Sequence, residues 1–216
     1  MSGRRDSGQA FPIYITVVAG LLLLAFVYFA VGQAASTRNG AQTAADAAAL
    51  AAAQDAREQL RDGWLDVILT PAEWPDFLDG ERFLTDPACR RAGVFAAKND
   101  AKLFGNEGCV PLDGEEGFSV TVRTLNTVGG SVIPGTDKQH AVASAKAVIE
   151  PRCTFKAPEP PAEPPGPEPP GPDPAPTPSD PGPILGLWCA GEPWEIDPDR
   201  PRLPRAVDLF TVRLAD

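Results

Sequence analysis

The sequence has few of the residues that most often carry out acid–base or metal chemistry. Its 216 residues include one histidine, His140, and four cysteines without a C-x-x-C spacing. It also lacks the G-x-S-x-G nucleophile motif, the G-x-x-x-x-G-K phosphate loop and the G-x-G-x-x-G dinucleotide motif. We therefore predict no enzyme activity, no catalytic residue, no metal site, no cofactor and no small-molecule substrate.

Neighbouring carboxylates do not change this expectation. An acidic chain places such residues close together by chance, and no sequence feature buries them as a raised catalytic pKa would require. The acidic stretch from residue 76 to 81 also lacks the D-x-D-x-D-G spacing of an EF-hand. The pairs in question are Glu115 with Glu116, Asp76 with Asp79, and Asp197 with Asp199.

Positive charge is scarce too, with five lysines, no basic run and a formal net charge of -10. Such a chain has no electrostatic means of neutralising phosphates, so nucleic acid is excluded as a partner.

Residues 11–31 form an uncharged apolar run, FPIYITVVAGLLLLAFVYFAV. Its 21 residues would span about 31 Å as a helix, close to the ~30 Å hydrocarbon thickness of a bilayer. Arg4 and Arg5 precede the run, and the positive-inside bias therefore places residues 1–10 in the cytoplasm. We predict a single-pass plasma-membrane protein whose C-terminal body is extracytoplasmic.

A cleaved signal peptide is the alternative, because a basic start, an apolar run and small residues at 32–35 are also its ingredients. The run is longer than a usual signal core of about 7–15 residues, which favours the membrane helix. Both interpretations export the body.

The exported region contains an even number of cysteines, and thiols there tend to be oxidised. Three pairings are possible. We favour Cys89–Cys109 and Cys153–Cys189, because the second bond would close the loop that holds the proline tract.

The overall pattern predicts an α+β protein. An alanine-rich helical stalk at 32–63 continues the membrane helix, with Gly40 as a weak point. A disulfide-bonded body at 64–156 follows, with a helix from Pro87 to Phe104 packed on an antiparallel sheet of strands at 118–125 and 140–153. Trp64, Trp74, Trp188 and Trp194 are expected in the core rather than on a sugar-binding or protein-binding surface.

Residues 157–183 contain 14 of the 25 prolines and predict a disordered, extended linker. The C-terminal segment 184–216 ends in an alternating pattern at 207–214, and we expect it to return to the body's sheet.

Residues 8–54, which begin Gly8-Gln9 and contain the run from Ala44 to Ala53, resemble the N-terminal signature of TadE/TadG-like proteins of the Flp (tight-adherence) pilus. The resemblance implies an envelope-anchored bacterial component of pilus assembly or secretion. Prepilins cleaved by prepilin peptidase carry a glutamate five residues after the cleaved glycine, and here that position is Ile13. The uncleaved TadG-like role is therefore expected.

The resulting hypothesis is a non-enzymatic structural or assembly component whose partners are the membrane and other pilus-assembly or envelope proteins. The alternative is a cell-wall binding module released by signal peptidase. Small side chains allow helices to approach closely, so we expect partner helices to pack on the alanine run. The predicted packing residues are Ala44, Ala48, Leu50, Ala51 and Ala52.

Overall fold

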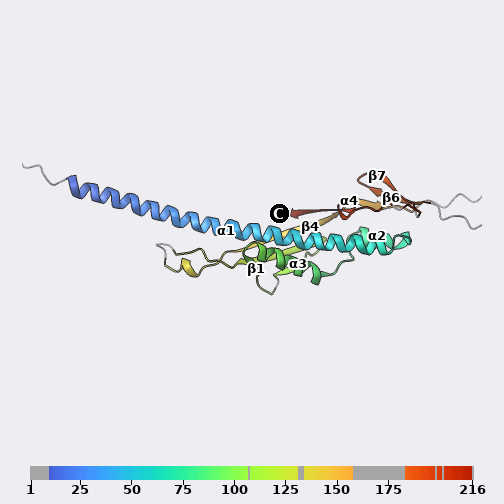
Figure 1. The fold of residues 1–216 in the computed structure, drawn as a ribbon, viewed down its shortest axis with the longest axis horizontal. Helices are drawn as coiled ribbons and strands as arrows, with labels where there is room; N and C mark the ends of the chain where they lie inside the picture. The colour runs from blue at the N-terminus through green and yellow to red at the C-terminus, as the bar shows by residue number, and fades with distance from the viewer. Residues whose placement is uncertain are drawn as a thin grey trace, which may run out of the picture.

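The computed structural model describes residues 10–106, 108–130, 134–157, 183–197, 199–200 and 202–215. The predicted cytoplasmic segment, apart from residue 10, and the predicted proline-rich linker, apart from its two end residues, lie outside the described residues. Figure 1 shows an elongated molecule built along one long helix. The elements in chain order are α1 (Ala10–Asp66), η1 (Pro71–Glu73), α2 (Trp74–Leu78), α3 (Thr85–Lys98), β1 (Ala101–Leu103), β2 (Cys109–Pro111), β3 (Gly117–Thr124), η2 (Thr136–Lys138), β4 (Val142–Pro151), β5 (Cys153–Phe155), β6 (Ile184–Cys189), β7 (Glu192–Ile196), α4 (Ala206–Leu209) and β8 (Phe210–Ala215).

Helix α1 runs without interruption for 57 residues, which corresponds to about 85 Å. Alanine has the highest helix propensity, and Pro12 lies in the first turn, where its missing N–H removes no helical hydrogen bond. The helix passes through both Gly40 and Gly63, so the predicted weak point at Gly40 is not a break. A single glycine costs about 1 kcal/mol in a helix, which the surrounding alanines readily offset.

The main sheet is antiparallel, in the order β1-β3-β4-β8, with β2 also pairing with β3. Burial alternates along β3, where Phe118, Val120 and Val122 face the helices, as the sequence pattern predicted. Strand β8 pairs with β4 from Pro151↔Phe210 to Lys146↔Ala215. The C-terminal segment therefore does return to the sheet of the body.

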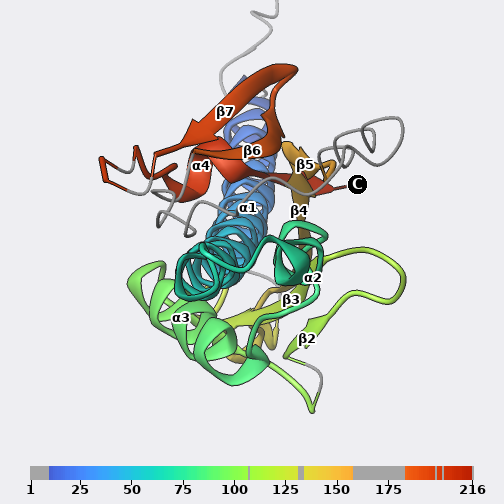
Figure 2. The ribbon, with the colours of Figure 1, turned by 90° about the vertical axis from the view of Figure 1, so that its right-hand side faces the viewer.

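A second, three-stranded sheet has the order β5-β6-β7 and lies at the C-terminal end of α1 (Figures 1 and 2). The register of β5 with β6 places Cys153 directly opposite Cys189, and the two form a disulfide. The other disulfide joins Cys89 of α3 to Cys109 of β2. The structure confirms the favoured pairing.

The core is thin along one part of α1 and thick along another. Beside α3 and the main sheet, the completely buried residues of α1 are alanines, such as Ala45 and Ala52. Toward its C-terminus it contributes Leu60 and Trp64, which pack with Trp74 of α2. The second sheet and α2 widen the core there, and larger side chains fill the added space.

The body therefore does not begin beyond a free stalk. The predicted stalk 32–63 and predicted body 64–156 pack on each other, because the chain turns back after Asp66 and covers α1 from Ala41 onward. Burying so many apolar positions along α1 is favourable at about 25 cal/mol per Å², whereas a stalk would leave them in water.

Helix α3 is shorter than predicted. It ends at Lys98, and residues 101–103 pair with β3 instead of continuing the helix to Phe104. Its start is held from α1, because Gln59 Oε1 accepts from Leu84 N at 2.9 Å and Gln59 Nε2 donates to Leu84 O at 3.2 Å. At its C-terminal end, the pairing of residues 101–103 with β3 thus overrides local helix propensity.

Two of the four glycines of α1, Gly40 and Gly63, give a matched test of the packing. A Cβ on Gly63 would lie 2.5 Å from Cε1 of Phe77, whereas a Cβ on Gly40 would have nothing within 4 Å. We expect Gly63→Ala to destabilise the protein by about 1–3 kcal/mol, because Phe77 must move in a packed core. Gly40→Ala should stabilise it by up to about 1 kcal/mol through helix propensity.

Thermal unfolding of both full-length variants in detergent, followed by circular dichroism, measures these shifts. Equal shifts at the two sites would contradict the close contact of α2 with α1.

Candidate functional site: an exposed apolar helix joined to a buried alanine face

The N-terminal half of α1 is almost entirely uncovered. Apart from half-buried Val18, its large apolar side chains from Phe11 to Val31 are between 44% and 83% exposed, as at Val27 and Tyr28. Soluble proteins rarely leave so large a contiguous apolar surface in water. Among the described residues, α1 is the one helix long and apolar enough to cross a membrane. The segment is thus a candidate membrane span.

The C-terminal half of α1 has the opposite character. Of the five predicted packing residues, Ala44, Ala48 and Ala52 are 0% exposed, Ala51 is 3% exposed and Leu50 is half-buried. All of them pack within the body of the same chain. The four buried alanines have no surface left for a partner, so the structure assigns them an intramolecular role, whereas Leu50 keeps part of its side chain exposed.

Part of this alanine face meets a second alanine row. The inner face of α3 carries Ala88, Ala92 and Ala96 at a spacing of four residues, and all three are completely buried. The helix that approaches the alanines of α1 is α3 of the same chain, whereas the sequence predicted helices of partner proteins there. Small side chains on both helices permit this short separation.

Charge on the alanine face is therefore expected to unfold the body. Ala48→Lys would place an ammonium group where no water reaches, at a cost of more than about 3 kcal/mol, a large part of a typical stability of 5–15 kcal/mol. Gln54→Lys, on the exposed side of the same helix, is the matched control and should leave stability nearly unchanged.

Limited proteolysis and circular dichroism of the full-length variants distinguish the two. A folded Ala48→Lys protein with wild-type protease resistance would instead indicate a face open to partners.

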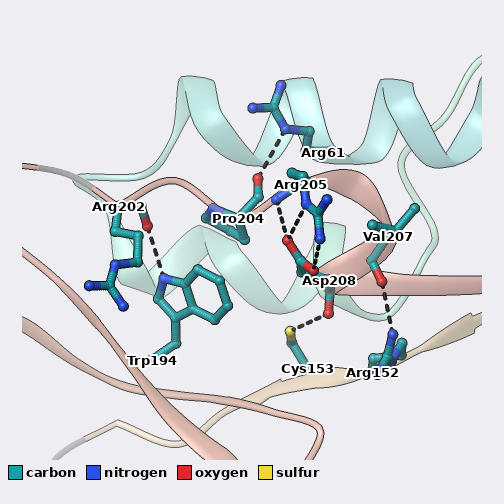
Figure 3. A network of polar contacts seen from close by, with 9 residues as sticks. All are labelled: Arg61, Arg152, Cys153, Trp194, Arg202, Pro204, Arg205, Val207 and Asp208. Carbon is teal, nitrogen blue, oxygen red and sulfur yellow. Dashed lines mark hydrogen bonds and ion pairs between the residues drawn. The ribbon is translucent and has the colours of Figure 1, made fainter.

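The C-terminal segment is fastened to α1 and to the second sheet by polar contacts (Figure 3). Arg61 of α1 donates to Pro204 O at 3.1 Å, and Arg152 donates to Val207 O at 3.0 Å. At the start of α4, the Asp208 carboxylate accepts a hydrogen bond from the Arg205 backbone N–H at 2.9 Å and forms an ion pair with the Arg205 guanidinium. Hydrogen bonds from Arg205 lower the pKa of the Asp208 carboxyl. These contacts fix where β8 begins.

One carboxylate is held in an unfavourable environment. Burial, and secondly the charge of Glu81, raise the pKa of Glu116, and the side chain of Glu116 lies against Gly80. Its backbone oxygen accepts a hydrogen bond from Ile149 N at 2.7 Å, which fixes the residue beside β4.

The raised pKa predicts a pH dependence. Because folding favours the protonated form, ionised Glu116 destabilises the protein above its folded pKa and not below the unfolded pKa. Glu116→Gln should therefore stabilise the protein at pH 7 by a few tenths of a kcal/mol, and this gain should disappear near pH 3.

Glu115→Gln, at the exposed neighbouring position, is the control for the general loss of one negative charge. The midpoints of chemical denaturation at the two pH values measure both effects, and an equal gain from both variants would contradict burial as the cause.

The tryptophans divide into two groups. Trp64 and Trp74 are completely buried, as expected for core residues. Trp188 is 46% exposed, contrary to that expectation, and Trp194 is half-buried with its indole N–H donating to Arg202 O. Trp194 also lines an open hollow of about 660 Å³ together with Pro193 and other residues of the second sheet and the following loop.

His140 has a structural role that its sequence context did not reveal. Its Nδ1 lies 2.8 Å from Thr124 O, across the base of the β3–β4 connection. Thr124 is buried and also bonds Asn126 O and Ala141 N through its hydroxyl. The sequence signal for the burial of Thr124 was the alternation along β3, in which Thr124 continues the series of inward-facing positions Phe118, Val120 and Val122.

No group of three or more His, Cys, Asp or Glu side chains within the described ranges is arranged to hold a metal ion. The paired carboxylates therefore have no metal-binding geometry in this part of the chain.

Comparison with known families bears on the two halves of α1. A family model, described as putative Flp pilus-assembly TadE/G-like, matches residues 8–55. Residues 8–55 carry the TadE/G-like signature. The match covers the exposed apolar half of α1 and most of its buried alanine face, and it supports a component related to Flp pilus assembly.

No curated protein and no solved structure matches the chain. The TadE/G-like signature is confined to α1 and its immediate N-terminal flank, so the sheets, α3 and the C-terminal segment have to be interpreted from their own geometry.

Proposed function

We propose that the chain is a non-enzymatic, membrane-anchored component of a Flp-type pilus or secretion system, with its N-terminus in the cytoplasm and its body outside. The observation that carries the proposal is the continuity of α1. One helix supplies both the exposed apolar segment and the main core helix of the body, and the TadE/G-like match spans the junction.

Further support for an extracytoplasmic body comes from its two disulfides and the lack of a free cysteine among the described residues. Disulfides persist in oxidising compartments and are rare in the cytoplasm. A body outside the membrane also agrees with Arg4 and Arg5 on the cytoplasmic side.

The surface left for protein partners is the uncovered half of α1 rather than its alanine face. It offers apolar side chains to lipid, and small residues such as Gly32, Ser36 and Gly40 allow another helix to approach. We propose that pilus-assembly partners contact this half in or near the bilayer.

Arginines in the middle of the apolar run test the anchor. Leu22→Arg with Leu23→Arg should impair insertion, because an arginine at the bilayer centre costs about 3 kcal/mol on insertion scales. The wild-type chain should remain in the membrane fraction until detergent is added, whereas the double variant should be depleted from it. Gln54→Arg, in the body, is the control.

The same fractions, analysed by intact mass, test for release. A full-length membrane species supports the anchor, whereas a species shortened near Ala35 in the medium would favour the cell-wall binding module. Deletion in the native host should also reduce pilus assembly, with rescue by the wild-type chain but not by the double variant. Undiminished piliation would contradict the assembly role.

A further inference from the structure

Strand β8 is the last strand of the main sheet on the side away from β1. It pairs with β4 along one edge, and no strand in the described part of the chain pairs with its other edge. In Figure 1 it is the red arrow that ends at the label C and runs back along α1, opposite to the direction of that helix. We call the unpaired side the outer edge of β8. Such an edge presents a row of backbone N–H and C=O groups that can pair with another chain.

The register shows which backbone groups lie on the outer edge. Arg152 N donates to Leu209 O at 2.8 Å, in register with the pairs of β4 and β8. Antiparallel strands bond through alternate residues, so the odd-numbered residues of β8 bond to β4. The N–H and C=O groups of Val212 and Leu214 therefore point away from β4. Leu214 O accepts a hydrogen bond from Arg213 Nη1 at 3.3 Å and, as a carbonyl, has a second lone pair for another donor.

Apolar side chains follow the outer edge on the side of the sheet that faces α1. Val212 and Leu214 lie opposite Ile149 and Ala147 of β4, both of which are buried. Val212, in contrast, is only half-buried, and Leu214 is 40% exposed. A strand added at this edge would cover both side chains with its own helix-facing row and remove apolar surface from water.

Helix α1 forms a floor beside this edge. Leu214 lines an open hollow of about 440 Å³ together with Gln42 and Asp46 of α1. Leu50, one helical turn beyond Asp46, keeps part of its surface exposed on the same side of the helix. Asp46 accepts a hydrogen bond from Gln42 Nε2 at 2.8 Å, but within the described residues it has no ion pair. Lys146 also lines the hollow, but it belongs to β4, which β8 separates from the outer edge.

From these observations we propose that the outer edge of β8 binds an extended segment of a partner protein, which adds to the main sheet as a further strand. Strand addition uses backbone hydrogen bonds for affinity and the side chains at every second position for specificity. The segment carries apolar side chains toward α1, where they cover Val212 and Leu214. It also carries a lysine or arginine beside Asp46, because that carboxylate lacks a positive partner.

A second copy of the chain is not the expected occupant. Antiparallel pairing of two β8 edges around a two-fold axis reverses the direction of one molecule. Because β8 runs along α1, the two α1 helices would then point in opposite directions. Two copies whose α1 helices span the same membrane, as proposed above, have helices that point the same way. In this one respect the choice of occupant rests on the proposed function.

A synthetic peptide tests the outer edge directly. The probe is a fluorescent peptide in which valine alternates with threonine and one terminal valine is replaced by lysine. The control is the same peptide with N-methyl groups on alternate backbone nitrogens, which removes the donors needed for strand addition. Binding to the full-length protein in detergent micelles is measured by fluorescence anisotropy, and amide hydrogen exchange locates the bound peptide on the protein.

We expect the unmethylated peptide alone to slow exchange at Val212 and Leu214, by about tenfold or more. The amide of Arg213, which faces β4, should be protected with and without peptide. Absence of binding, equal binding of the methylated peptide, or protection confined to residues outside β8 would each overturn the proposal. Dimers of the protein alone that protect Val212 and Leu214 would overturn it as well, because the occupant would then be a second copy.

Two variants separate the backbone contribution from the charge. Leu214→Pro removes an N–H from the outer edge and none that bonds to β4, so it should weaken peptide binding by about tenfold while melting like Leu214→Ala. Asp46→Lys should reverse the preference, from the lysine peptide to one with glutamate in its place. If the proline lowers the melting temperature, the charge reversal decides, and an unchanged preference would contradict the proposal.

The membrane fractions described above keep this proposal separate from the anchor. A chain that is absent from the membrane but still binds the peptide at β8 would show that the proposed function fails while the edge site stands. A chain that stays in the membrane and binds no peptide would overturn the edge site alone.

Discussion

The close contact of the alanine face of α1 with α3 and the main sheet is the interaction on which the rest of the structure depends. Every layer of the body packs on this one helix, directly or through a neighbour. Alanine suits the position because its small volume lets two helices and a sheet meet around the same helix without voids. A larger or charged side chain there would separate α1 from both α3 and the main sheet.

Because the same helix also carries the exposed apolar segment, the candidate membrane span and the body are mechanically one piece. A body joined to its anchor by a flexible linker could sample many orientations, whereas an uninterrupted helix transmits orientation from one part to the other. The buried side of residues 30–41 extends this rigidity to the end of the apolar run.

The sequence contained clear signals for the local parts of this arrangement. The uncharged run, the alternation along β3 and the cysteine pairing were all predictable, because each depends on short-range pattern or on chain connectivity. The sequence pattern at 207–214 also predicted a strand that returns to the sheet. In the structure this strand, β8, begins at Phe210, and the first residues of the expected strand belong to α4.

What the sequence could not reveal was which surfaces meet. An alanine-rich helix looks the same whether it stands free or is covered, so the face around Ala48 was assigned to partner helices rather than to α3. The strand at residues 101–103 was hidden for a related reason, because its pairing with β3 is a long-range contact that outweighs helix propensity. The separate sheet β5-β6-β7 brings together strands that lie on the two sides of the proline-rich tract, which no local pattern reports.

The continuity of α1 across the junction of anchor and body is the central claim, and amide hydrogen exchange of the full-length protein in lipid nanodiscs tests it most directly. Exchange reports local opening, and an unbroken helix held at both ends opens rarely. A continuous helix predicts slow exchange from residue 14 to residue 64, including residues 32–40, where every position except Gln33 and Thr37 is exposed. Exchange in that stretch at the rate of an unstructured peptide would show a break between anchor and body, and would contradict the account.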